Sequence, residues 1–269
     1  MTTAAKLTVD SEGRVQGANI TWNSPWPCAN GDGGGMSVPH GIMGLLEHTM
    51  VGNLLPGTVS WFNNPAAQAS AHFGVDQLGN IHQFGPVNGW MAWHCAEGNP
   101  NWFGCEFADD GVPANPLTAA QITAAAQLLE LLSRPDLGNF PLQISDNTST
   151  EGYGWHGMGG LAFGDHPDCP GDVRKAQRPQ IVALAMSIRQ GVPVPAANYV
   201  QHVTVGESSL AQLAAQNHCE VSAILRLTLQ HSPNGLFEPD VATLIDGLCG
   251  GAIAPAALMP AGLVLYLPA

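Results

Sequence analysis

In the first 190 residues, short apolar or alternating runs predict strands, and apolar residues at helical spacing predict helices. Residues 41–48 form a continuous apolar run that ends at a charged pair, as expected for a buried strand whose end reaches solvent. Residues 103–108 form a second short apolar run, broken by one carboxylate. Residues 15–22 alternate loosely and indicate another strand. Residues 71–75 and 81–84 flank a polar turn that contains glycine, which predicts a hairpin.

The clearest helix is predicted at residues 118–134. Thr118 can cap its start, because a glutamine follows three positions later, as in a capping box. Apolar residues then recur at helical spacing. Residues 173–190 show the same periodicity and predict a second amphipathic helix. The remaining expected elements are a short helix at 61–70 and a strand at 140–144.

The amino-acid composition changes near residue 192 and divides the chain into two parts. Residues 192–197 read Val-Pro-Val-Pro-Ala-Ala, which is typical of a linker. Seven tryptophans occur up to residue 155 and none afterwards. We therefore expect a large domain at 1–191 with its core at about 35–190, a linker at 192–198 and a small unit at 199–269.

Composition excludes several kinds of partner. The chain has 269 residues, 45% of them hydrophobic, which is enough for a sizeable core. It carries only eight Lys and Arg residues and a net charge of −13, which argues against binding nucleic acid or docking electrostatically on an anionic membrane or wall polymer. Residues 1–10 lack the apolar stretch of a secretory signal, and no run of about 18 apolar residues predicts a membrane span.

The six cysteines do not form a CxxC pattern or reach the density of a disulfide scaffold. Without a secretory signal, reduced thiols are the default expectation. Two pairings stay open on spacing alone, Cys95 with Cys105 and Cys219 with Cys249.

Candidate metal ligands concentrate at residues 155–172, read WHGMGGLAFGDHPDCPGD. His156 and Cys169 suit a ligand at a strand end and another on the following loop, although an ordinary surface loop would explain this pair if it stood alone. His48 lies at the end of a predicted strand. Three protein ligands leave one tetrahedral position for water, which is the pattern of a catalytic rather than a structural zinc site.

Six short motifs occur in an order that is similar to one known family. They are His48-Thr49, Ser70-Ala71-His72-Phe73, the hairpin from Asp76 to Phe84, Ala92-Trp93-His94, Phe103-Gly104-Cys105-Glu106 and Asp168-Cys169-Pro170-Gly171. Over about residues 35–190 the chain resembles the zinc N-acetylmuramoyl-L-alanine amidases of type 2, a family shared with peptidoglycan recognition proteins and phage lysozyme-amidases. The resemblance implies an α/β fold with a mixed central β-sheet flanked by helices, and a hydrolase that cuts the amide between N-acetylmuramic acid and L-alanine.

The resemblance also implies roles for particular residues. His48, His156 and Cys169 fall on the zinc ligands, and many members have Asp where Cys169 stands. Glu106 falls on the general base that acts on the zinc water. A carboxylate in an apolar strand is also costly without a partner, which favours a role in function.

Other positions carry open alternatives. His94 and Trp93 fall on a Trp-His motif that lines the substrate groove, but plain packing would explain them equally well. His72 is a further substrate-binding candidate, against the simpler expectation of a buried strand histidine. The lysine that often precedes the third ligand by two residues is replaced by Pro167, so His166 could stabilise the oxyanion instead. His166 is also a rival to His156 as a metal ligand.

The C-terminal unit is similar to a LysM domain. The similarity lies in residues 199–228 and 259–268, which read as the two ends of a βααβ unit, with residues 229–258 as an insertion that the family does not normally have. A LysM domain implies binding to N-acetylglucosamine in glycan chains. The alternative is a small βααβ unit with some other role.

These observations lead to one preferred function and two alternatives. The preferred function is a zinc-dependent, bacteriolytic peptidoglycan hydrolase of the phage endolysin kind. It would be held in the cytoplasm of an infected host and would reach the cell wall after the membrane is permeabilised. The alternatives are a non-catalytic peptidoglycan receptor on the same fold and an endopeptidase that cuts within the stem peptide.

Overall fold

The computed structural model describes residues 6–52, 55–109, 115–191, 199–203 and 264–268. The chain forms two compact units, Met1–Ala196 and Ala197–Ala269, and each is described by itself. Within the described residues, no helix is both long and apolar enough to cross a membrane.

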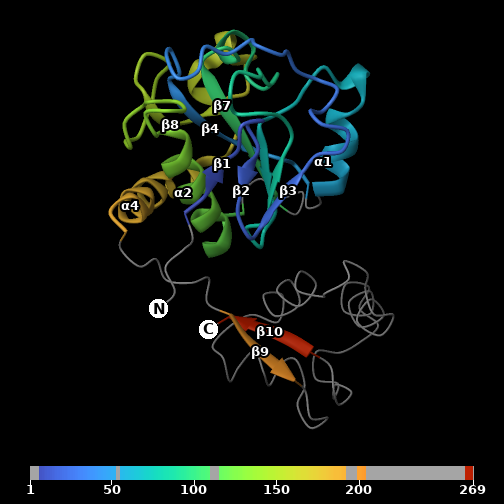
Figure 1. Cartoon of the computed structure of the whole chain (residues 1–269). Coiled ribbons are helices and arrows are strands. Elements are labelled where there is room, and N and C mark those ends of the chain that lie inside the picture. Colours follow the sequence, from blue (N-terminus) through green and yellow to red (C-terminus); the bar gives the residue numbers. More distant parts are fainter. Residues whose placement is uncertain (1–5, 53–54, 110–114, 192–198, 204–263, 269) are drawn as a thin grey trace. The chain divides into compact units, whose positions relative to one another are not determined.

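The first unit is built on a six-stranded mixed sheet in the order β3-β6-β5-β7-β4-β8 (Figure 1). The β5–β6 pair is antiparallel, as the predicted hairpin requires, and the other neighbouring pairs are parallel. This confirms an α/β fold with a mixed central sheet. The strands are β3 (Ile20–Trp22), β4 (Gly44–Thr49), β5 (Phe73–Val75), β6 (Ile81–Gln83), β7 (Trp102–Phe107) and β8 (Gly152–Trp155).

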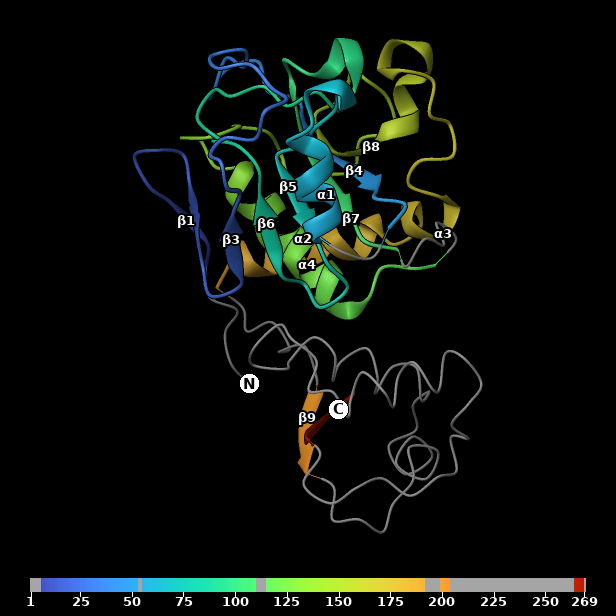
Figure 2. The ribbon, with the colours of Figure 1, turned by 90° about the vertical axis from the view of Figure 1, so that its right-hand side faces the viewer.

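Helices cover both faces of this sheet. Figure 2 shows α1 in front of the sheet, with α2 and α4 behind it. The predicted capping box is present at the start of α2, where Thr118 and Gln121 each bond to the other's backbone N–H. Pro135 follows soon after α2 ends, as expected. The helices are α1 (Leu55–Phe62), α2 (Ala119–Leu132), α3 (Asp172–Lys175) and α4 (Arg178–Arg189), with short 3₁₀ helices at η1 (Pro65–Ala67), η2 (Ala96–Gly98) and η3 (His156–Phe163).

Side chains alternate between the two faces of the central strands, so that one face packs into the main core and the other face carries the candidate site. Leu45 of β4 belongs to the main hydrophobic core, together with apolar residues of α2 and α4, while Leu46 belongs to a separate cluster with Trp102 and Phe163. In β7, Phe103, Cys105 and Phe107 belong to the main core. Because successive side chains on a strand point to opposite faces, Gly104 and Glu106 lie on the other face.

Several predicted boundaries are wrong. The helix expected at 61–70 begins earlier, at Leu55, and gives way to η1 beyond Phe62. The strand expected at 140–144 is reduced to an isolated bridge between Ile144 and Tyr153. Strand β8 follows it and ends just before His156, which agrees with a ligand at a strand end, although its bounds were not predicted. The helix expected at 173–190 is divided into α3 and α4, because a proline follows Arg178 at the start of the second helix. The strand expected at 15–22 is divided into β2 (Val15–Gln16) and β3.

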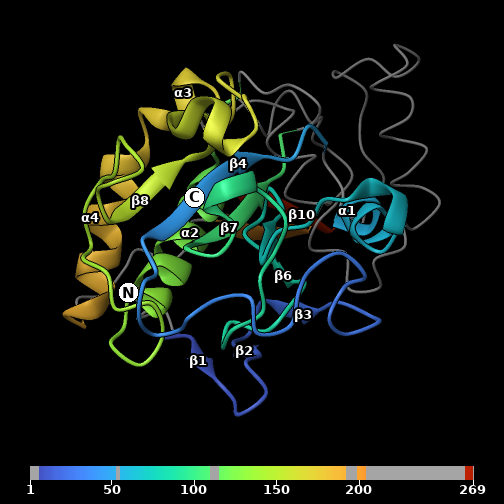
Figure 3. The ribbon, with the colours of Figure 1, turned by 90° about the horizontal axis from the view of Figure 1, so that it is seen from above.

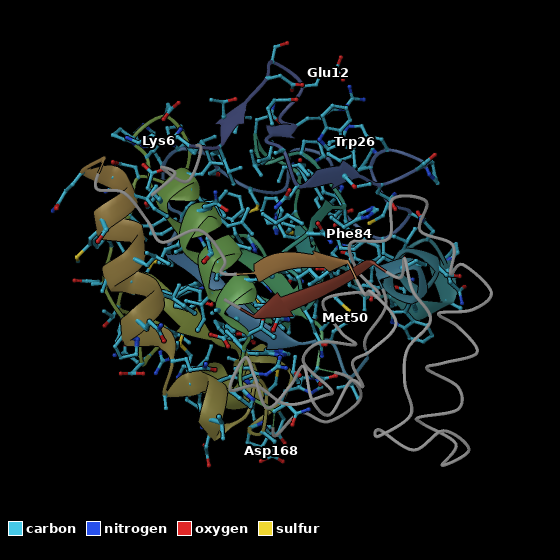
Figure 4. The ribbon with its side chains drawn as sticks, turned by 90° about the horizontal axis from the view of Figure 1, so that it is seen from below. Lys6, Glu12, Trp26, Met50, Phe84 and Asp168 are labelled. Atoms are coloured by element: carbon cyan, nitrogen blue, oxygen red, sulfur yellow. The ribbon has the colours of Figure 1, made fainter. Side chains whose placement is uncertain are left out.

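The N-terminal strands form a small hairpin of their own. Strand β1 (Thr8–Val9) pairs with β2 in antiparallel fashion. Figure 4 shows Asp168 at the edge of the first unit opposite Lys6 and Glu12, so the loop that carries Cys169 is far from this hairpin.

All four described cysteines, Cys28, Cys95, Cys105 and Cys169, are free thiols. The pairing of Cys95 with Cys105 that spacing left open is therefore wrong. The second open pairing, Cys219 with Cys249, lies outside the described residues.

In the second unit, the structure describes β9 (Tyr199–Val203) and β10 (Val264–Pro268). They pair antiparallel, Val264 opposite Val203 and Pro268 opposite Tyr199. The helices expected between them, and the insertion at 229–258, lie outside the described residues.

Candidate metal centre and active site

The site lies where three parallel strands end at the same edge of the sheet. Seen from above in Figure 3, β8, β4 and β7 run next to one another. The register pairs His48 with Glu106, and Glu47 with Trp155, which directly precedes His156. Backbone pairing therefore brings His48, Glu106 and His156 together although they are 50 or more positions apart in sequence. Ligand sites in α/β sheets commonly form at the carboxyl ends of strands.

His48, His156 and Cys169 form the candidate metal centre. One donor atom from each residue lies within 4.8 Å of the others. Both histidines are buried, at 2% and 7% exposure, and Cys169 is partly buried. Imidazole nitrogens with one thiolate form a donor set that suits zinc, and three donors in a pocket open on one side leave a position for water.

Each histidine has one ring nitrogen occupied by a neighbour. His156 Nε2 lies 2.8 Å from the carbonyl oxygen of Phe163, which can only accept, so this nitrogen carries the proton. His156 Nδ1 is then left with a free lone pair. Metal-binding histidines are commonly fixed in this way by a carbonyl or carboxylate on the other nitrogen.

Burial keeps both imidazoles neutral. It lowers the pKa of His48 well below its usual value, and the neighbouring His156 and His94 lower it further. Burial likewise lowers the pKa of His156 to about 4. A metal ligand must offer an unprotonated nitrogen, so this environment prepares both rings for a cation.

Cys169 is held by the end of β4. The backbone N–H of Thr49 donates to its Sγ over 3.3 Å. The Thr49 hydroxyl donates to Asp109 over 2.6 Å and accepts from the guanidinium of Arg174 over 3.3 Å. Burial raises the pKa of the Cys169 thiol, so a bound cation is needed to stabilise the thiolate.

Glu106 is the carboxyl group beside the cluster. Its Oε1 lies 3.9 Å from His48 Nδ1, and its Oε2 is buried without a hydrogen-bond partner among the described residues. Burial, reinforced by the nearby Asp109, raises the pKa of Glu106 to about 8, against an opposing effect of Arg174. A carboxyl group with this pKa exchanges protons near neutral pH, as a general acid–base group requires.

The donor atoms open into a cavity of about 520 Å³, which Glu106, Trp93 and His166 also line. A second hollow of about 490 Å³ adjoins it and reaches α1, where it is lined by the half-exposed Trp61. A third, of about 300 Å³, follows the loop at 165–169. Thr49 and Val51 line all three, so the hollows form a groove that passes over the metal centre.

The other residues expected in the site have different positions. His166 is exposed at the rim, with its ring centroid 4.6 Å from that of His156, and it is not part of the three-residue cluster. Trp93 lines the cavity and donates from its ring nitrogen to Asp32 over 2.9 Å. His72 is fully buried, with both ring nitrogens bonded to backbone groups, so its expected contact with substrate finds no support in this placement.

His94 lines the cavity, but its ring nitrogens are both used inside the protein. Nδ1 lies 3.0 Å from His48 Nε2, and Nε2 lies 3.0 Å from the carbonyl oxygen of Trp102. Sequence reasoning placed His94 at the groove and did not find its contact with His48.

Sequence reasoning also missed the support behind Cys169. Arg174 has no exposed surface, and its guanidinium donates to the carbonyl oxygens of Phe107, Ala108 and Asn115. In the sequence it looks like an ordinary cation at the start of a helix. No local pattern indicates that it is buried, since its partners lie about 60 positions away.

Comparison with known proteins connects this geometry to a family. The family model of N-acetylmuramoyl-L-alanine amidases matches residues 39–171. N-acetylmuramoyl-L-alanine amidase A of Achromobacter lyticus is 36% identical over 86 residues, which cover 31% of this chain and 47% of that protein. The match thus spans about half the length of the curated relative.

Solved structures include similar folds. Hydrolase AmiA of Staphylococcus aureus, in complex with its ligand, has a TM-score of 0.48 at 17% identity, covering 66% of this chain and 87% of AmiA. The N-acetylmuramoyl-L-alanine amidase LysC of Clostridium intestinale has a TM-score of 0.43 at 16% identity, covering 62% and 97%.

Proposed function

We propose, from the match of residues 39–171 to the N-acetylmuramoyl-L-alanine amidase family model, that the chain hydrolyses the amide between N-acetylmuramic acid and L-alanine in peptidoglycan. One observation carries the proposal. The two-histidine, one-cysteine cluster shares an open cavity with Glu106, whose Oε2 has no hydrogen-bond partner among the described residues. A bound cation and a nearby carboxyl group are together one established means of hydrolysing an unactivated amide.

We propose zinc as the ion that His48, His156 and Cys169 hold. Zinc in a site of this kind supplies a Lewis acid and lowers the pKa of a coordinated water to about 7. The protein's own part is to keep both imidazoles neutral by burial and to hold the sulfur of Cys169 through Thr49.

Glu106 is proposed as the general base and acid. Its position beside His48, and an Oε2 without a hydrogen-bond partner in the described part of the chain, suit it to take a proton from the attacking water. The same carboxyl then delivers that proton to the amine of L-alanine as the C–N bond breaks. We propose that an N–H of His166, which is exposed and lines the cavity, donates to the oxygen that becomes negative in the tetrahedral intermediate.

Purified peptidoglycan gives the direct test. We expect the zinc-loaded chain to release new amino termini that are all L-alanine, identified by labelling the products and by mass spectrometry. New termini on other residues would indicate an endopeptidase, and reducing sugar without new termini would indicate a glycosidase. Binding to the wall without any new termini would contradict an enzymatic function. The Cys169→Ala variant provides the matched inactive control.

The second unit is proposed to bind glycan in the manner of a LysM domain. The antiparallel pairing of β9 with β10, at the two ends of the unit, is the pairing that a βααβ fold needs. Such a unit would raise the effective concentration of the catalytic unit at the wall. Sedimentation with purified walls, comparing the full chain with a chain ended at residue 196, tests this; equal sedimentation of both would refute it.

We also propose a phage endolysin-like role, in which the chain acts on the wall from the cytoplasm of an infected bacterium. A wall-cutting unit joined to a wall-binding unit supports it. Expression inside bacteria should cause lysis only once a membrane-permeabilising agent is added. Lysis before such treatment, or none after it, would contradict this role.

A further inference from the structure

His94 lies directly behind the first proposed metal ligand. Its Nδ1 is 3.0 Å from His48 Nε2, and the two rings are nearly perpendicular, with an interplanar angle of 76°. The other nitrogen of His94 is 3.0 Å from the carbonyl oxygen of Trp102, at the start of β7. The three groups form a continuous hydrogen-bonded chain that begins at a backbone oxygen and ends at His48.

The chemistry of this chain allows one arrangement of protons when His48 binds a cation. The carbonyl of Trp102 can only accept, so His94 Nε2 carries a proton. His94 Nδ1 must then accept from His48 Nε2–H. That leaves the lone pair of His48 on Nδ1, the nitrogen that faces Glu106 across 3.9 Å.

We infer that His94 is a positioning residue which fixes the tautomer and ring orientation of His48, so that His48 Nδ1 is the metal-binding nitrogen. The inference rests on the metal site of the proposed function. It replaces a role in contacting substrate, because neither ring nitrogen of His94 is left over for one. Partners of this kind behind a ligand commonly change metal affinity about 10–100-fold when they are removed.

Gly104 supplies independent support for this assignment. A Cβ at position 104 would lie 2.6 Å from both Cγ and Nδ1 of His94. Strand β7 therefore carries a residue without a side chain just where the ring of His94 rests against it. An alanine there would push the ring away from its position behind His48, because contacts under 3.0 Å require one partner to move.

Two substitutions separate positioning from packing. In His94→Asn the amide oxygen can take about the place of Nδ1 and accept from His48, whereas in His94→Gln the amide reaches the place of Nε2 and the acceptor for His48 is lost. Zinc affinity, measured by competition with a chromophoric chelator, should fall about 10–100-fold in His94→Gln and in Gly104→Ala. His94→Asn should recover most of that loss.

His82→Gln serves as the matched control, because it removes another buried imidazole that is outside the cavity and whose Nε2 has no hydrogen-bond partner among the described residues. Its zinc affinity should equal that of the unsubstituted chain. Far-ultraviolet circular dichroism restricts the comparison to variants that fold. ¹⁵N spectra of the zinc-loaded chain should show metal bound at His48 Nδ1 and a proton on His48 Nε2.

The outcomes separate this inference from the proposed function. If the unsubstituted chain binds no zinc, both fail. If it binds zinc and His94→Gln binds equally well, or if the spectra show zinc on His48 Nε2, the inference about His94 is wrong and the proposed function stands. Equal losses in His94→Asn and His94→Gln would likewise overturn the inference, since packing alone would then account for them.

Discussion

Replacing Glu106 by glutamine should change activity and stability in opposite directions. The substitution keeps the size of the side chain and removes its ability to exchange protons. General acid–base groups contribute about 10²–10⁴-fold to rate, so kcat should fall by that factor, or about 3–5 kcal/mol of transition-state stabilisation. Zinc affinity should stay close to that of the unsubstituted chain, because Glu106 does not belong to the three-residue cluster.

The stability of the metal-free chain should rise. Burial raises the pKa of Glu106 from 4.5 to about 8, so the folded chain favours the protonated form and becomes less stable as pH rises from 4.5 towards 8. At pH 7 this difference corresponds to about 3 kcal/mol of lost folding free energy, an upper figure that glutamine would recover.

Two measurements on the same variant check this reasoning. Amide cleavage is followed with zinc-loaded protein, and urea unfolding is followed at pH 5 and pH 8 with a chelator present. We expect the stability gain of Glu106→Gln to be larger at pH 8 than at pH 5. Activity within threefold of the unsubstituted chain would refute the role of Glu106 as a base, and a loss of stability at pH 8 would refute the account of its environment.

Three further predictions concern other parts of the first unit. Cys169→Ala should lower zinc affinity, measured by chelator competition, by more than about 100-fold, which exceeds the usual effect of removing a residue that only supports a ligand. Cys169→Asp should keep measurable zinc binding. Equal zinc affinities in the two variants would contradict ligation by Cys169. Gly44→Ala should lower the free energy of unfolding, measured with urea, by about 3 kcal/mol or more, because its Cβ would lie 1.8 Å from the carbonyl oxygen of Gly152. A decrease of less than about 1 kcal/mol would refute this prediction. Burial lowers the pKa of His82 to about 4, so its imidazole stays neutral in the folded chain. In the unfolded chain the same group takes up a proton below about pH 6.5, and His82 should therefore lower the folding stability by about 2 kcal/mol between pH 8 and pH 5. Unfolding of His82→Gln over the same range should lack that part of the loss, and an identical pH profile would show the prediction wrong.

Local patterns in the sequence predicted the elements with strong periodicity. The apolar run that ends at His48 became β4, the hairpin around residues 76–80 formed as β5 and β6, and the capping box at Thr118 starts α2. The bounds of strand β8 were missed because Gly152–Trp155 is a four-residue segment with two glycines, and its pairing with β4 and its bridge to Ile144 cannot be read from its own pattern. A short strand of this kind is defined by its neighbour rather than by its own residues.

The sequence also predicted the candidate site only in part. His156 and Cys169 stood out because candidate ligands concentrate at residues 155–172, His48 because it ends a predicted strand and Glu106 because it interrupts an apolar run. The resemblance to a known family supplied their roles. The contacts behind them could not be found, because they join residues that are far apart and chemically ordinary in the sequence. Arg174 and Thr49 are separated by 125 positions, and His48 and His94 by 46.

Strand register explains why so much of the site depends on a few glycines. His48 and Glu106 are neighbours only because β4 and β7 run parallel in that exact pairing, and β8 must approach β4 closely enough to place His156 beside them. Gly44 permits the approach of β8, and Gly104 leaves room for the ring behind His48. A shift of one residue in either pairing would turn a donor or the carboxyl group to the opposite face of the sheet. The chemistry of the cavity is therefore set by backbone packing at these two positions as much as by the residues that face it.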